Sequence, residues 1–287
     1  MIVCEPTSGL TSRIYVIADA YDMASKFGQE LVIIWRKTAD CDCSYKMVFS
    51  DNQFSNVKCK VYECNQFDFK FSNLKSEFSF RNLAISLREI GIRLVYFIKH
   101  TFVYHLYRSK CSIYKNSYVD NNELFDQQKA KGCNCFFEAY NCITGTGKVD
   151  NIRFRNQYES IAKKIVGSFV EHCVGVHIRR TDHGPAKAAS TTEKFIIRMK
   201  KEIENDPEAA FFLATDDWNE QKRMIEIFGK RIITQPDKVL ERSSKKGIES
   251  SIIDIICLSK TRYILGSSCS IFSKFAADYG NIQLYIV

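Results

Sequence analysis

The chain has 287 residues, of which 45% are hydrophobic, 26% are charged and only four are proline. This length and composition exclude a disordered or low-complexity chain and predict an ordered globular protein of two domains. The formal net charge of +8 favours an anionic partner, but the basic residues are scattered, which argues against a nucleic-acid-binding protein.

The N-terminus and the cysteines indicate the compartment. No basic segment followed by an apolar run opens the chain, so we expect no signal peptide and a cytoplasmic location. No apolar run reaches the length needed to cross a membrane. The twelve cysteines are therefore expected to be reduced thiols. Cys41 and Cys43, like Cys133 and Cys135, have one residue between them, a spacing shorter than zinc sites use, so we expect no metal and no cofactor.

The first predicted unit is a strand, a helix and a second strand. Residues 2–4 are apolar, apolar residues recur at helical spacing from Ile14 to Phe27, and residues 31–35 are typical of a buried parallel strand. Gly9 lies in the turn before the helix. A helix N-terminus after such a turn can bind an anion, so Gly9 is a candidate substrate-binding residue, with an ordinary βα turn as the alternative. Residues 38–80 predict short strands and loops.

Residues 81–110 predict a long amphipathic helix. Its apolar stripe consists of Leu83, Leu87, Ile90, Leu94, Phe97 and Ile98, and continues with Phe102 and Leu106. The segment holds six basic residues and one acidic residue, Glu89. We favour a helix whose stripe packs into its own domain, because most amphipathic helices face a core. The alternative is peripheral contact with an anionic membrane, at the inner face of the cell membrane.

Two features precede the second domain. Residues 144–148 are similar to a phosphate-binding P-loop, but Cys142 stands at the first glycine position and Val149 stands where Ser or Thr is required. We therefore expect an ordinary loop there. A helix over residues 158–169 ends the first domain, so the predicted domains are 1–169 and 170–287.

Strands and helices alternate regularly from residue 170 onward. The expected strands are 174–178, 210–214, 231–234, 263–265 and 283–286, and the expected helices are 191–205, 219–228, 247–260 and 271–279. This alternation predicts an α/β fold with a parallel, doubly wound sheet.

Polar residues follow three of these strands. His177, Arg179, Arg180 and Asp182 end the first strand, Thr215, Asp216 and Asp217 end the second, and Ser267, Ser268 and Ser270 begin the helix after the third. The carboxyl ends of parallel strands meet at one edge of a sheet, where ligands bind. Arginines and a helix N-terminus can hold a diphosphate there, and carboxylates can hold a ribose or a base. We therefore predict a nucleotide-diphosphate site.

This chain resembles the superfamily of GDP-fucose-dependent fucosyltransferases, most closely its α1,6-fucosyltransferase and nodulation-fucosyltransferase branch. The resemblance starts from His177, Arg179, Arg180 and Asp182, which match a His-x-Arg-Arg-x-Asp motif. Residues 8–13 are similar to the family's N-terminal glycine loop, residues 212–217 to its second block, and residues 254–259 with 266–270 to its third. The resemblance covers nearly all of 170–287 and about 5–35.

The resemblance implies a GT-B-like fold, in which two Rossmann-type domains with mainly parallel sheets face a cleft. It also implies inverting, metal-independent transfer of fucose from GDP-fucose to a hydroxyl of a glycan acceptor, which could be lipid-linked, in the synthesis of a cell-surface polysaccharide. By position, Arg179 would contact the diphosphate, supported by Arg180, His177 and Asp182. Asp254 would read the guanine. The remaining donor-site residues would be Gly9, Arg13, Thr215, Asp216, Asp217, Ser268 and Ser270.

The resemblance does not identify the general base. Relatives place a carboxylate shortly after the motif, but residues 184–192 contain no acid. His183 is the candidate because an unperturbed histidine titrates near neutral pH. The alternatives to a fucosyltransferase are a GT-B enzyme that uses another nucleotide sugar and a non-catalytic protein that binds a nucleotide or a glycan.

Overall fold

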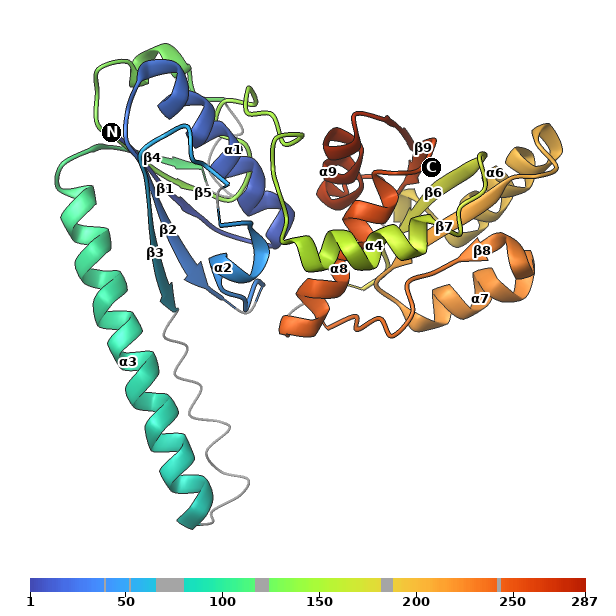
Figure 1. Ribbon diagram of the computed structural model, residues 1–287, viewed down its shortest axis with the longest axis horizontal. Coiled ribbons are helices and arrows are strands. Elements are labelled where there is room, and N and C mark those ends of the chain that lie inside the picture. Colours follow the sequence, from blue (N-terminus) through green and yellow to red (C-terminus); the bar gives the residue numbers. More distant parts are fainter. Residues whose placement is uncertain (39, 52, 66–79, 117–123, 182–187, 242–243) are drawn as a thin grey trace. The chain divides into compact units, whose positions relative to one another are not determined.

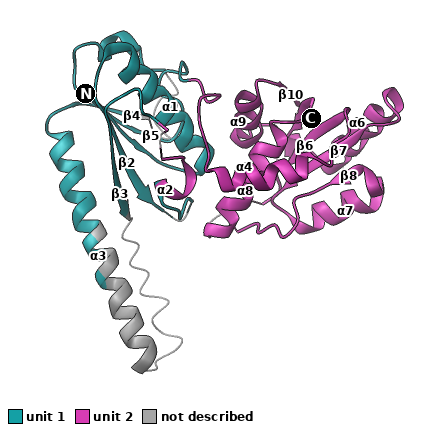
Figure 2. Cartoon of the chain, viewed as in Figure 1, with its two compact units in different colours: residues 1–45, 54–147 teal, residues 46–53, 148–287 magenta. Residues whose placement is uncertain are grey.

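A computed structural model describes residues 1–38, 40–51, 53–65, 80–116, 124–181, 188–241 and 244–287. The chain divides into two compact units (Figures 1 and 2). Unit 1 comprises Met1–Tyr45 and Phe54–Gly147, and unit 2 comprises Lys46–Gln53 and Lys148–Val287. The division after residue 147 differs from the expected boundary at 169/170. Helix α4 (Asn156–Val166) belongs to unit 2 because it packs against α8 (Lys245–Leu258).

Unit 1 is built on a parallel sheet. Its described strands run in the order β3-β2-β1-β5-β4. They are β1 (Ile2–Pro6), β2 (Leu31–Lys37), β3 (Cys59–Asn65), β4 (Ser112–Asn116) and β5 (Cys135–Ala139). The predicted first unit is confirmed: helix α1 (Leu10–Phe27) connects β1 to β2 and ends at Gly28, whose φ of 61° is left-handed, as a helix C-cap requires. The short helix η2 (Gln127–Ala130) lies in a connection of this unit, whereas the short helix α2 (Tyr45–Val48) falls in unit 2 from Lys46 onward.

Helix α3 (Phe80–Arg108) packs on this sheet, but with a different face from the one we expected. Val103 and Tyr107 are buried against a core that includes Val3, Val32 and Phe136. The Tyr107 hydroxyl lies 3.0 Å from that of Tyr62 on β3. The predicted stripe is exposed wherever its side chains are described, namely at Leu94, Phe97, Ile98, Phe102 and Leu106. The favoured interpretation was therefore wrong for this part, because the helix carries two apolar stripes and the sheet takes the one with Val103 and Tyr107.

The loop that is similar to a P-loop is an ordinary loop, as expected, and its backbone N–H groups bind a carboxylate of the same chain. Asp19 on α1 is buried and accepts hydrogen bonds from the backbone N–H groups of Ile143 (2.6 Å), Thr144 (2.9 Å), Gly145 (3.0 Å) and Gly147 (2.7 Å). A Cβ on Gly147 would come within 2.3 Å of the α1 backbone, so the close approach requires glycine. The anion that this loop binds is therefore the Asp19 carboxylate of the same chain.

Unit 2 has a second parallel sheet, whose described strands run in the order β10-β9-β6-β7-β8. They are β6 (Cys173–Ile178), β7 (Ala210–Thr215), β8 (Ile232–Ile233), β9 (Tyr263–Gly266) and β10 (Gln283–Ile286). Besides α4 and α8, the helices are α6 (Thr192–Asn205), α7 (Trp218–Phe228) and α9 (Ile271–Gly280), with the short η3 (Gly229–Arg231). The α/β class with parallel sheets is thereby confirmed. None of the helices in the described ranges is long and apolar enough to span a membrane.

The strand register of unit 2 brings the three predicted polar clusters together. Ile178 is paired with Thr215 and His177 with Gly266. The segments that follow β6, β7 and β9 therefore begin at the same edge of the sheet. The core below this edge is formed by large apolar side chains such as Phe195, Phe211 and Leu213.

Candidate functional site

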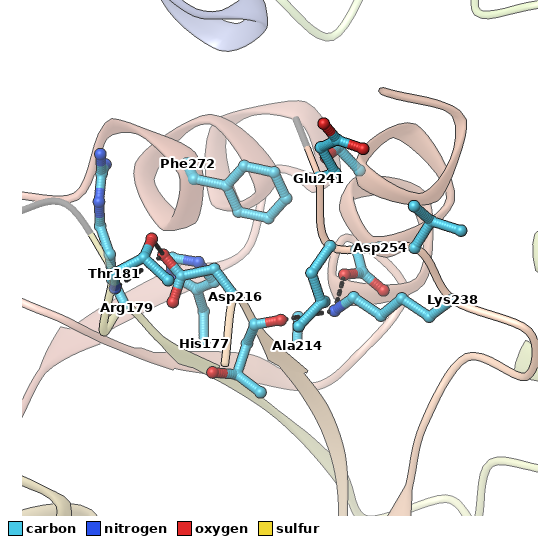
Figure 3. Close-up of a pocket in the computed structure, with 13 residues that line it drawn as sticks. His177, Arg179, Thr181, Ala214, Asp216, Lys238, Glu241, Asp254 and Phe272 are labelled. Carbon is cyan, nitrogen blue, oxygen red and sulfur yellow. Dashed lines mark hydrogen bonds and ion pairs between the residues drawn. The ribbon is translucent and has the colours of Figure 1, made fainter. Parts of the chain in front are cut away.

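A pocket of about 340 Å³ lies at the carboxyl edge of the unit 2 sheet (Figure 3). Arg179 and Thr181 lie at one side of it, and Lys238 and Asp254 lie at the other. Its lining comes from β6 and the following segment, β7, the segment before α8, α8 itself and α9: His177, Arg179, Thr181, Ala214, Thr215, Asp216, Lys238, Val239, Leu240, Glu241, Ser251, Asp254 and Phe272. The pocket thus carries Arg179 with Asp216 on one side and Lys238 with Asp254 on the other, so each side has a cationic and an anionic group.

The backbone after β6 is held by two side chains from neighbouring strand ends. The backbone N–H of Arg179 donates to Ser267 Oγ (3.0 Å), and Ser267 is fully buried. Asp216 accepts the backbone N–H of Arg180 (2.6 Å) and the hydroxyl of Thr181 (2.6 Å). Asp216 lines the pocket, as its predicted role requires, but its carboxylate is already bonded to this segment. It therefore positions the residues that follow β6.

The two adjacent arginines have different environments. Arg179 lines the pocket. The Arg180 guanidinium instead donates to Ser190 O (2.9 Å) and Thr192 Oγ1 (3.1 Å) and pairs with Glu220 (3.4 Å). Arg180 is not among the lining residues and holds the segment after β6 against α6 and α7. Of the two predicted arginines, Arg179 is the one placed to meet a ligand.

His177 is a buried residue that lines the pocket. Its ring stacks on Phe272 with centroids 4.7 Å apart, and its Nδ1 lies 3.5 Å from Ser270 Oγ at the N-terminus of α9. Burial is the largest cause that lowers the pKa of His177 to about 3; the Asp216 carboxylate opposes this effect, and the cations Lys238 and Arg179 add to it. Ser270, which we expected in the donor site, lies close to His177 at this helix end but is not among the lining residues. Ser268 is not a lining residue, and its backbone N–H donates to Ser190 Oγ (2.8 Å).

Lys238 and Asp254 form a buried ion pair at the far side of the pocket. Their side chains are each 5% exposed, and Lys238 Nζ lies 2.5 Å from Asp254 Oδ2. Lys238 also donates to the carbonyl of Thr215 (2.8 Å), and the Gln235 amide, in the orientation that satisfies its hydrogen bonds, places its nitrogen 3.1 Å from Asp254 Oδ1. Burial raises the pKa of Asp254, and the Lys238 ammonium opposes that effect. The pair presents a carboxylate of fixed orientation to the pocket.

Sequence reasoning identified Asp254 but missed Lys238 and Phe272. Lys238 is one of 41 lysines and arginines and follows no strand or helix pattern, so only its tertiary contacts distinguish it. Phe272 had a usable signal, because it is the second residue of the helix that Ser270 caps.

Asp217 has a structural role. It is the N-cap of α7, where its carboxylate accepts the backbone N–H groups of Asn219 (2.7 Å) and Glu220 (3.1 Å). Thr215, by contrast, lines the pocket beside Asp216. The predicted run of three residues therefore divides, with Thr215 and Asp216 at the pocket and Asp217 in the helix cap.

Gly9 and Arg13 lie in unit 1. Gly9 is the N-cap of α1, with an extended backbone, and no side-chain cap bond accompanies it. Arg13 is 0% exposed, and its guanidinium donates to Ser8 O (2.7 Å), Arg36 O (2.5 Å) and Thr38 Oγ1 (2.7 Å) while lying 5.1 Å from the centre of the Trp35 ring. Arg13 thus ties together the loops after β1 and β2.

Asp182 and His183 lie outside the described residues. Within the described ranges, no group of three or more His, Cys, Asp or Glu side chains is arranged to hold a metal ion.

The fold is similar to solved structures of fucosyltransferases. The α-1,6-fucosyltransferase NodZ co-crystallised with GDP matches 96% of this chain and 90% of its own, with a TM-score of 0.56 and 17% identity. FUT1 of Arabidopsis thaliana, as a mutant with GDP, matches 99% of this chain and 69% of its own, with a TM-score of 0.57 and 12% identity. POFUT1 with GDP-fucose matches 99% and 97%, with a TM-score of 0.54 and 8% identity. No family model and no curated protein sequence matches the chain. At these identities the likeness establishes the fold.

Proposed function

We propose that the protein is a glycosyltransferase that moves fucose from GDP-fucose to a hydroxyl of a glycan acceptor. The observation that carries this proposal is the unit 2 pocket, in which Arg179 and the Asp254–Lys238 pair stand on opposite sides. A GDP moiety has an anionic diphosphate at one end and hydrogen-bond donors on its base at the other. The fold supports the proposal because similar proteins were crystallised with GDP or GDP-fucose.

Donor binding follows from these two sides. Arg179 would hold the diphosphate through charge-assisted hydrogen bonds, and the N-terminus of α9 adds a positive helix end. Asp254 would accept hydrogen bonds from the N1–H and the 2-amino group of guanine. Lys238 and Gln235 keep the carboxylate in one orientation, so they act as positioning residues. Arg180 and Asp216 support the site through the backbone after β6.

The proposed reaction is a single inverting displacement. The acceptor oxygen forms a bond to the anomeric carbon of fucose from the side opposite GDP, and the bond between that carbon and the phosphate oxygen breaks. Negative charge then accumulates on the diphosphate, where a preorganised arginine can stabilise it without a metal ion. The acceptor proton passes to a base, for which we propose His183. His177 is unsuited to this role, since its pKa of about 3 makes it a weak base at neutral pH.

The proposal is tested by GDP release from GDP-fucose in the presence of a panel of oligosaccharides and lipid-linked polysaccharide precursors. We expect release only with a suitable acceptor, unchanged by EDTA, and a product whose anomeric configuration is inverted by NMR. Release from GDP-mannose or UDP-glucose alone would assign another donor. GDP-fucose binding without release from any acceptor in the panel would favour the non-catalytic binding protein.

A further inference from the structure

Helix α3 has two apolar faces, and unit 1 covers only one of them where side chains are described. The inner face packs on the sheet through Val103 and Tyr107, with His100 bonded to the buried Glu5 of β1 at 2.9 Å. These positions are spaced three, four and seven residues apart, which is the repeat of one helix face. The orientation of the helix is therefore fixed by its polar and apolar contacts with the sheet.

The outer face consists of large apolar side chains exposed to solvent. Leu94, Ile98 and Phe102 follow one another at four-residue intervals, with exposures of 45%, 58% and 67%. Val95, Phe97 and Leu106 broaden this face, and a shallow hollow forms between Phe97, Ile98, Phe102 and Leu106 with Thr101 and His105. Isolated exposed apolar residues are common, but a contiguous apolar patch of this kind marks an interaction surface.

The charge of the same helical segment indicates which kind of partner this apolar face binds. Residues 80–110 contain Arg81, Arg88, Arg93, Lys99, Arg108 and Lys110, and only one acidic residue, Glu89. Lys99 and Lys110 are exposed. Two copies of this segment would bring like charges together, which opposes self-association through this face. An apolar helix face combined with basic residues instead matches the boundary between acyl chains and anionic headgroups.

We propose that α3 docks on an anionic phospholipid membrane, with the outer face of Leu94, Val95, Phe97, Ile98, Phe102 and Leu106 inserted at the level of the headgroups. The helix lies in the membrane surface and does not cross it, which agrees with the finding on the described helices. The inference rests on unit 1 alone and is independent of the proposed transfer reaction. Its consequence is that the protein meets membrane-associated partners at the surface where it is bound.

The first test is cosedimentation of the full chain with vesicles. We expect binding to vesicles of phosphatidylcholine with phosphatidylglycerol at low salt, weaker binding at high salt, and little binding to phosphatidylcholine alone. Phe102→Asp should lower the partition coefficient about tenfold or more. The matched control is Ile197→Asp, because Ile197 on α6 is 68% exposed and Phe102 is 67% exposed, and this control should bind like the wild type.

A second test reports insertion directly. Phe102→Trp fluorescence should shift to the blue on anionic vesicles and be quenched by lipids with brominated acyl chains, whereas Ile197→Trp should show neither change. Thermal melting of each variant shows that it is folded. The proposal is overturned if vesicles do not bind the wild type at low salt, or if both aspartate variants lose binding equally. It is also overturned if Phe102→Asp abolishes a concentration-dependent dimer or a protein complex while vesicle binding stays unchanged.

Discussion

Units 1 and 2 place an arginine near the carboxyl edge of similar parallel sheets, yet the two arginines have different surroundings. Arg13 of unit 1 is fully buried and donates to three oxygens of its own chain. Arg179 of unit 2 lines the pocket. A position at a strand edge therefore does not by itself make an arginine a ligand group. The two positions differ because the Arg13 guanidinium is buried among oxygens of its own loops, whereas Arg179 lines a pocket.

The same distinction recurs within unit 2. Arg180 is held by Ser190, Thr192 and Glu220, although it is adjacent to Arg179. Asp217 caps a helix, although it is adjacent to the pocket residue Asp216. Neighbouring residues of one motif therefore divide between ligand binding and support, and substitutions should separate the two groups.

The largest expected effect is that of Arg179→Ala on the transfer rate. Loss of one preorganised donor to a developing negative charge should lower kcat about 10²- to 10³-fold, with an unchanged melting temperature. The measurement is GDP release from GDP-fucose. Arg223→Ala is the control, because its pair with Glu193 is on the surface and its loss should leave the rate unaltered. A normal transfer rate in a folded Arg179→Ala protein would contradict the proposed role of Arg179.

Arg13→Ala should instead lower the free energy of unfolding, by roughly 2–3 kcal/mol, because three partly buried acceptors lose their donor and a cavity opens beside Trp35. Urea denaturation measures this loss. GDP affinity of the folded variant should stay near that of the wild type. Unchanged stability together with lost GDP affinity would contradict the comparison and make Arg13 a ligand group.

Lys238→Met tests whether the ion pair with Lys238 orients the Asp254 carboxylate for hydrogen bonds with guanine. We expect GDP affinity to fall about tenfold, roughly 1.4 kcal/mol, because the Asp254 carboxylate loses the cation that orients it. The ratio of the affinity for GDP to the affinity for inosine diphosphate, which lacks the 2-amino group, should be smaller in the same variant. Lys238→Arg should restore part of both. A uniform loss for both nucleotides would assign Lys238 a general electrostatic role.

His177 should make stability depend on pH. Its folded pKa of about 3 lies below the unfolded value near 6.5, so the unfolded state binds more protons between these values. As pH falls below 6.5, protonation of His177 in the unfolded state therefore lowers the free energy of unfolding, by up to about 1.4 kcal/mol per pH unit. Unfolding at a series of pH values should show a flatter profile for His177→Gln than for the wild type. Identical profiles would exclude a buried neutral histidine.

Asp217→Ala should have the smallest effect, a loss of about 1 kcal/mol in the free energy of unfolding from the missing N-cap. Asp217→Asn should recover most of it, since asparagine also caps helices. Calorimetric titration should find GDP affinity unaltered in both. A marked loss of GDP affinity would show that Asp217 takes part in ligand binding.

Much of the fold was predictable because its strands are apolar runs between helices. The strands β1, β2, β6 and β7 follow this rule, and their helices have regular apolar spacing. Strand β4 has the mixed sequence Ser-Ile-Tyr-Lys-Asn at the sheet edge and lacks such a run. The sequence of α3 supports two apolar stripes, and only the partners on the sheet decide which one is buried.

The residues at the strand ends of the candidate site were predictable from the sequence, but the contacts that support them were not. His177 and Arg179 were found because charged and polar residues follow a buried strand directly. The separation of Arg179 from Arg180 was not predictable, because Ser190, Thr192 and Glu220 come from other segments. Lys238 was missed for the same physical reason: its role arises from a contact with Asp254, sixteen positions later in the chain.

Calorimetric titration of the wild-type protein and of Arg179→Ala with GDP, UDP and ADP tests the proposed donor site. We expect the wild type to bind GDP more tightly than UDP or ADP, and Arg179→Ala to bind GDP at least about tenfold more weakly while remaining folded. Equal affinity of the wild type for all three nucleotides, or no binding of GDP, would contradict the proposed donor site.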